Sequence, residues 1–189
     1  MEDYKHLEAT MLHTIVSYVR LFLPIFYAIG AWKFGDWRHW KKYYPTILFI
    51  ISVDFFISII MYRYPLWTFR KSFFNPNHTI FDFIVAFTFF APIVLIFLSR
   101  YPYKSMWYKQ VLYISAWVIF EVFIEAMIFS AKLITYHNGW NFWWSSVVWV
   151  FLFFGVRLHH TRPLWAWLVC FVCTAFLIIY FHIPITKFR

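Results

Sequence analysis

Two glutamates inside one long apolar segment are the residues of this chain best placed to do chemistry. Glu121 and Glu125 interrupt the stretch VLYISAWVIFEVFIEAMIFSA, which is long enough to cross a bilayer. Residues four apart share one face of a helix and are about 6 Å apart along its axis. An ionised carboxylate near the centre of a membrane helix costs roughly 2.5–3.5 kcal/mol. We therefore expect both side chains to face protein or a wet cavity rather than lipid.

Further polar side chains are expected at the same depth. Of the eight acidic residues, four fall inside apolar segments. Following each segment across the bilayer predicts an intramembrane polar cluster of Arg20, Asp54, His78, Asp82, Glu121, Glu125, His137, Asn138 and Asn141. Arg20 is the expected counter-ion. One arginine against four carboxylates leaves an excess of acid, so either some carboxylates carry a proton or a cation joins them.

Two other motifs combine polar residues at the ends of apolar segments. In YHNGWN, residues 136–141, Gly139 permits a positive φ, and the flanking His and Asn side chains suit either a helix cap or a functional site. In RLHHTRP, residues 157–163, the basic side chains are Arg157, His159, His160 and Arg162. We interpret this second motif as a cytoplasmic-face turn in contact with anionic headgroups, in preference to a ligand site.

Composition places these motifs in a membrane protein. The 189 residues are 63% apolar, 27% aromatic and only 13% charged, which is too apolar for a soluble domain of this length. The net charge of +9 comes from short Lys and Arg clusters between apolar segments, which favours contact with the lipid bilayer over binding of nucleic acid. Cys170 and Cys173 lie in the last apolar segment, where small apolar filler is the favoured interpretation.

The elements that position these residues are predicted to be about six transmembrane helices in a single all-α, polytopic bundle. The predicted spans lie near 13–32, 45–62, 80–98, 111–131, 142–158 and 164–182. Pro24 and Pro92 fall near the middle of the first and third spans, where a missing amide hydrogen bond tends to kink a helix. Connections one, three and five hold nine Lys and Arg residues, against seven on the opposite side of the membrane, and together with the acidic start of the chain this favours both termini outside.

Several motifs, taken in the order in which they occur along the chain, resemble those of a known group of membrane proteins. YYPTILF, the NHT-x-x-D segment, YHNGWNFWWS and RLHH-x-x-PL-x-AW resemble a family of small, uncharacterised multi-pass membrane proteins of Bacillus and related Firmicutes, over about residues 37–167. The resemblance implies a location in the plasma membrane of a Gram-positive bacterium. It brings no activity, substrate or cofactor with it.

Three functions remain open from the sequence. Protonatable groups at mid-membrane favour proton- or cation-linked transport or permeation of a small solute, which for six helices predicts a homodimer. A structural or accessory subunit would use the same groups for helix packing. A metal-binding protein would draw its ligands from His78, Asp82, Glu121, Glu125 and His137. No nucleophile elbow, phosphate loop or zincin motif is present, so an enzyme is the least supported class.

Overall fold

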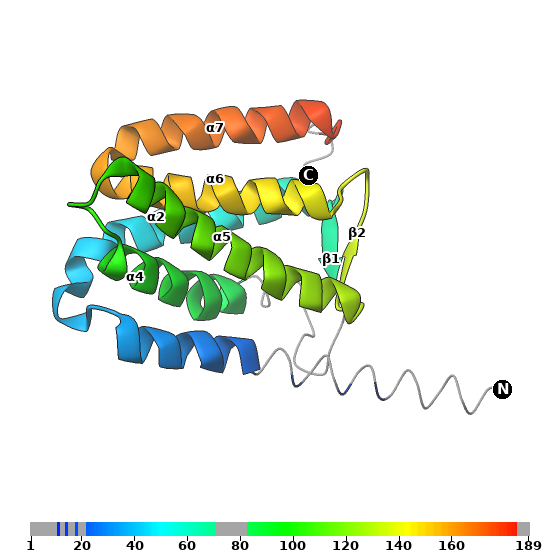
Figure 1. Cartoon of the computed structure of the whole chain (residues 1–189). Coiled ribbons are helices and arrows are strands. Elements are labelled where there is room, and N and C mark those ends of the chain that lie inside the picture. The colour runs from blue at the N-terminus through cyan, green and yellow to red at the C-terminus, as the bar shows by residue number, and fades with distance from the viewer. Residues whose placement is uncertain (1–10, 12–13, 15–17, 19–21, 71–82, 185–189) are drawn as a thin grey trace.

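The protein folds as an all-α helical bundle, as the sequence predicts. The computed structural model describes residues 11, 14, 18, 22–70 and 83–184. In chain order the elements are the helix Phe22–Phe34, the 3-10 turn η1 (Trp37–His39), α2 (Trp40–Met61), β1 (Trp67–Phe69), the π-helical turn η2 (Ala86–Phe90), α4 (Ala91–Arg100), α5 (Trp107–Ser130), β2 (Ile134–Tyr136), α6 (Phe142–Thr161) and α7 (Pro163–Tyr180) (Figure 1).

Five helices are long and apolar enough to cross a membrane, so this is a multi-pass membrane protein. They are Trp37–Met61, Phe83–Arg100, Trp107–Ser130, Phe142–Thr161 and Pro163–Tyr180. The first predicted span, 13–32, is only partly described, and its described helix Phe22–Phe34 is shorter than a crossing needs. α2 and α5 begin some residues before the predicted boundaries, because helices continue through the aromatic headgroup zone instead of stopping at the hydrocarbon edge.

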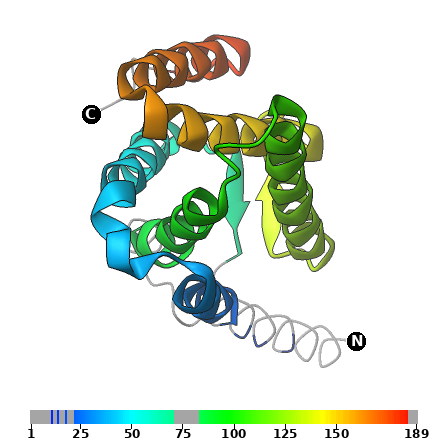
Figure 2. The same cartoon turned by 60° about the vertical axis from the view of Figure 1, so that its left-hand side comes forward.

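α4 is the central helix of the bundle. Its six consecutive residues Ile93–Leu98 are all buried, with exposed fractions between 0 and 9%. Figure 2 shows α4 enclosed by α2, α6 and the helix Phe22–Phe34. The Phe97 ring lies 5.0 Å from the ring of Phe153 on α6 and 5.4 Å from that of Tyr113 on α5. A helix that is apolar on every side is suited to such a fully enclosed position.

The distortion expected at Pro92 takes the form of a π-helical turn. Proline has no amide hydrogen, so the carbonyl of Thr88 receives no bond from Pro92. Just before the proline, the amide of Ala91 bonds instead to the carbonyl of Ala86, five residues back. The turn η2 therefore widens the third span immediately before it enters the enclosed segment of α4.

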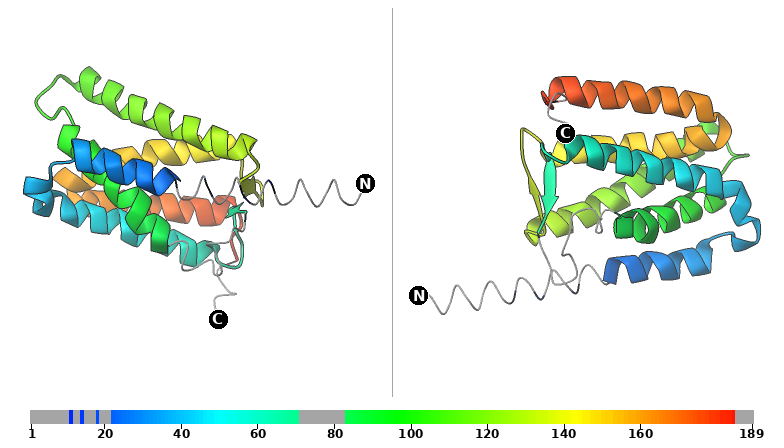
Figure 3. Two further views of the ribbon diagram at one scale, coloured as in Figure 1. Left: turned by 90° about the horizontal axis from the view of Figure 1, so that it is seen from below. Right: turned by 180° about the vertical axis from the view of Figure 1, so that it is seen from behind.

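One end of the bundle is closed by two short strands that the sequence did not predict. β1 and β2 pair antiparallel, with Thr68 opposite Thr135, at the end where α2 finishes and α6 starts (Figure 3). The amide of His137 extends the ladder by donating to the carbonyl of Leu66 at 2.8 Å. The strands thus tie the connection after α2 to the connection after α5, far apart in the chain.

The YHNGWN motif builds the start of α6. Asn138 and Gly139 adopt positive φ angles of 52° and 82°. Asn141 then caps the helix, because its Oδ1 accepts hydrogen bonds from the amides of Trp143 at 3.0 Å and Trp144 at 3.2 Å. Of the two roles left open for this motif, the structure shows the capping one.

Replacing the cap should destabilise the fold. We expect Asn141→Ala to lower the free energy of unfolding by about 1 kcal/mol, because two amides at the start of α6 lose their acceptor. Thermal unfolding in detergent micelles measures the effect. Asn141→Asp is the matched control, since aspartate caps helices equally well, and equal stability of the Ala and Asp variants would contradict the capping role.

Candidate functional site

A cavity of about 630 Å³ lies inside the bundle, in the half that contains β1 and β2. Its walls come from the helix Phe22–Phe34, α2, the third span with η2, α5, α6 and both strands. This volume falls in the range of about 300–1,000 Å³ typical of small-molecule sites. The cavity is the place where residues distant in the sequence meet.

Glu121 is the most deeply buried carboxyl group of the cavity wall. It is 1% exposed and is the one fully buried residue of α5. The hydroxyl of Tyr27, from the helix Phe22–Phe34, donates to its Oε2 at 2.8 Å. Its Oε1 is also buried and has no hydrogen-bond partner among the described residues. The described residues therefore hold one oxygen of this carboxyl group and leave the other unpaired.

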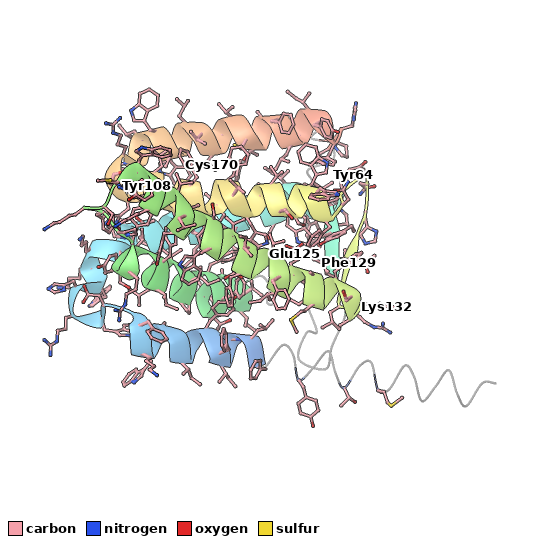
Figure 4. All side chains as sticks on the ribbon, viewed as in Figure 1. Tyr64, Tyr108, Glu125, Phe129, Lys132 and Cys170 are labelled. Carbon is pink, nitrogen blue, oxygen red and sulfur yellow. The ribbon has the colours of Figure 1, made fainter. Side chains whose placement is uncertain are left out.

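Glu125 lies one helical turn further along α5, and both of its oxygens are engaged. The hydroxyl of Tyr136 on β2 donates to Oε1 at 2.7 Å, and the indole Nε1 of Trp149 on α6 donates to Oε2 at 2.7 Å. Figure 4 shows Glu125 between Tyr108, in the first turn of α5, and Lys132, just after the helix ends. Burial and the adjacent Glu125 carboxylate raise the pKa of Tyr136, so its hydroxyl remains a donor at physiological pH.

Asp54 of α2 is the third carboxyl group of the cavity wall. No Lys, Arg or His belongs to the part of the wall that the structure describes. The remaining polar lining consists of hydroxyl groups, whereas most of the wall is apolar or aromatic. The aromatic lining residues are Tyr62, Trp67, Phe69, Phe89, Phe90, Trp140 and Trp149. The cavity therefore combines acidic groups with an aromatic surface.

The predicted intramembrane cluster is divided by the structure. Asp54, Glu121 and Glu125 line one cavity. The other three described members lie in the connection between β2 and α6, outside the cavity wall and exposed: His137, Asn138 and Asn141. His137 Nε2 lies 2.8 Å from Thr68 Oγ1, and Asn138 donates to the carbonyl of Pro65 at 2.8 Å. Arg20, His78 and Asp82 lie outside the described residues.

Metal ligation is not supported by the described part of the chain. Within residues 22–70 and 83–184 no three His, Cys, Asp or Glu side chains gather as a metal site would require. Three of the five predicted metal candidates are described. Glu125 and His137 already hydrogen-bond to protein groups, and Glu121 shares its carboxyl group with Tyr27.

Sequence reasoning did not identify the residues that hold the carboxylates. Tyr27 and Trp149 lie 94 and 24 positions from their glutamate partners. Aromatic residues make up 27% of the chain, so nothing in the sequence distinguishes these two from the others. Tyr136 belongs to a motif that was noted, but its pairing with Glu125 depends on the turn between α5 and β2.

The basic motif at the opposite end of the bundle packs inward. The guanidinium of Arg157 lies over the rings of Tyr101, at 4.8 Å, and Tyr103, at 5.0 Å. His159 is only 8% exposed and stacks on Phe49 at 4.2 Å.

The remaining members of this motif are less deeply placed. His160 is half-buried and stacks on Tyr43 at 5.8 Å, whereas Arg162 is exposed. Burial raises the pKa of the neighbouring Tyr103, and the positive charge of Arg157 opposes that shift. Arg162 is thus the member most open to headgroups, and the others are packed against aromatic rings.

Comparison with known proteins adds no family or fold relative. No family model, no curated protein and no solved structure matches this chain. The resemblance seen in the YHNGWN and RLHH motifs therefore remains a prediction.

Arg157 provides one test of the packing at the basic end. We expect Arg157→Lys to lower the free energy of unfolding by about 1–2 kcal/mol, because an ammonium cannot lie flat over two tyrosine rings as a guanidinium does. Chemical denaturation in micelles measures the change. Arg162→Lys, at an exposed position, is the control and should leave stability unchanged; a similar loss in both variants would argue against a stacking role for Arg157.

Tyr136 provides a second test, at the cavity. Tyr136→Phe should reduce the free energy of unfolding by about 1.5–3 kcal/mol, because Oε1 of Glu125 loses a donor in a poorly hydrated site. The measurement is thermal unfolding of purified protein. Tyr108→Phe removes an exposed hydroxyl from the first turn of α5 and serves as the control. If Tyr136→Phe is as stable as the wild type, Glu125 does not depend on this bond.

Proposed function

We propose that this protein mediates proton- or cation-linked transport or permeation of a small solute, with the acidic cavity as the binding site. The observation that supports this function best is the state of Glu121. Glu121 is 1% exposed, lines a cavity of about 630 Å³, and one of its carboxyl oxygens has no hydrogen-bond partner among the described residues. Such a group exchanges a proton or pairs with a cation as the cavity fills and empties.

The three carboxyl groups have different roles in this proposal. Glu121 is the exchanging group, because Tyr27 fixes only one of its oxygens. Glu125 is held in place, since Tyr136 and Trp149 donate hydrogen bonds to its two oxygens. Asp54 adds negative charge from α2, on another wall of the cavity. The site thus contains one carboxyl group that exchanges its proton, Glu121, and two neighbouring carboxyl groups that influence this exchange.

The π-helical turn η2 is the part of the wall best suited to move. Three of its residues line the cavity, Thr88, Phe89 and Phe90, and so do Ile84 and Val85 just before it. A π-turn leaves its backbone bonds less regular than an α-helix does, and π-turns are frequent at functional sites. We propose that η2 changes its hydrogen bonding when the cavity opens, while the enclosed α4 stays in place.

The proposed location is the plasma membrane of a bacterium, with both termini outside and the cavity in the outer half of the bundle. The resemblance of the sequence motifs supports the bacterial membrane. The excess of Lys and Arg in connections one, three and five supports a cytoplasmic position for the end that carries Arg157. A homodimer is proposed because a bundle of this size is small for an alternating-access path.

A structural or accessory subunit is the second candidate function. The observation in its favour is that Glu125 joins three elements, α5, β2 and α6, through two hydrogen bonds of 2.7 Å. A carboxylate used in this way fixes helix packing and needs no ligand.

Proteoliposomes distinguish the two candidates. With a dye sensitive to protons, or to sodium as the test cation, inside the liposomes and a potassium diffusion potential imposed, wild-type protein should carry that ion inward, and Glu121→Gln should reduce the rate at least tenfold because the exchanging acid is gone. Asp36→Asn is the control, since Asp36 pairs with His39 at the opposite end at 3.0 Å. Wild-type flux no greater than that of empty liposomes would overturn transport of ions, and flux that Glu121→Gln leaves unchanged would remove Glu121 from the path.

A further inference from the structure

The chemistry of the cavity wall indicates what kind of solute it accepts. Asp54, Glu121 and Glu125 contribute three carboxyl groups, and the described wall contains no basic side chain. At short range, carboxylates attract a cation and disfavour an anion. The charge of the wall therefore favours a positively charged occupant.

The unpaired oxygen of Glu121 adds a requirement for a hydrogen-bond donor. Oε1 is buried without a partner among the described residues, whereas Oε2 accepts from Tyr27 and both oxygens of Glu125 are engaged. A buried acceptor without a partner is costly, so the occupant that best fits this atom donates a hydrogen bond to it. A donor that is also charged gives a shorter and stronger bond.

The rest of the wall favours an organic cation over a metal ion. Calcium takes six to eight oxygen ligands and magnesium requires an octahedral set, whereas no three acidic, His or Cys groups among the described residues are arranged so that they could hold one metal ion. Trp67, Trp140 and Trp149 instead line the cavity together with Phe89. Aromatic side chains attract cations through their faces and pack against apolar groups.

We propose that the cavity binds a small primary amine with an apolar or aromatic body, whose ammonium group donates a hydrogen bond to Oε1 of Glu121. Tyr27 holds the other oxygen of this carboxylate and so fixes the direction of Oε1. The apolar body packs against the tryptophan and phenylalanine side chains of the wall. This assignment rests on the proposed function, because it names the class of solute for the same cavity.

Three small ligands of similar shape but different charge test whether the cavity requires a cation. Their binding is measured to the full chain in lipid nanodiscs. 2-Phenylethylamine is a cation at pH 7, 2-phenylethanol is its neutral counterpart, and 3-phenylpropionate is an anion. Calorimetric titration should show saturable binding of the amine, at least tenfold tighter than that of the alcohol, and no binding of the anion. Equal affinity for amine and alcohol, or no binding of the amine, would overturn the assignment even if no variant could be purified.

Glu121→Gln tests the specific contact. The glutamine carbonyl can still accept from Tyr27, but its amide group presents donors to the cavity, so affinity for the amine should fall about 10- to 100-fold while affinity for the alcohol changes little. Asp36→Asn is again the control and should bind the amine as the wild type does. An unchanged affinity of Glu121→Gln for the amine would show that the ammonium group lies elsewhere.

The same probes keep this assignment separate from the proposed function. Glu121-dependent binding of the amine without uptake into liposomes would support the ligand class and overturn transport. Glu121-dependent flux of protons together with no binding of the amine would support transport and overturn the ligand class.

Discussion

Hydrocarbon does not solvate a carboxylate, and this constraint sets the orientation of α5. Apolar side chains occur on every face of this helix, and lipid is as apolar as a protein interior, so burial of apolar surface alone does not select which face turns inward. Glu121 and Glu125 break that symmetry. The face that carries them points into the bundle, and large apolar residues such as Ile119, Phe123 and Met127 remain exposed on the others.

Tyrosine and tryptophan supply the solvation that lipid cannot. Their rings pack in an apolar environment while a hydroxyl or an indole N–H remains available as a donor. Tyr27, Tyr136 and Trp149 approach α5 from three different elements, so the two carboxylates act as attachment points for the helix Phe22–Phe34, β2 and α6. Helix packing and the acidic cavity therefore depend on the same bonds, and a change in one affects the other.

The sequence predicted the helices and the inward-facing side of α5 better than it predicted which residues hydrogen-bond to Glu121 and Glu125. Spans follow from apolar length, and the cost of a charge in lipid gives the direction of Glu121 and Glu125. The strand pair β1–β2 was missed because each strand has only three residues, too few for a periodic pattern. His137, Asn138 and Asn141 were placed in the polar cluster only from their expected depth in the membrane. Depth does not show that these side chains form hydrogen bonds within the connecting loop and with the residues beside it.

The two ends of the bundle use aromatic rings in opposite ways, and this bears on how a solute could pass. At the cavity end, ring-borne hydroxyl and N–H groups donate to carboxylates; at the other end, ring faces receive cations, as Tyr103 does for Lys42 and Arg157. Between them lies the buried apolar segment Ile93–Leu98 of α4. In the proposed transport function, a cation in the cavity would meet this apolar segment and then positive charge, so its onward movement would require rearrangement of the helices around α4. The turn η2 lies directly before the apolar segment.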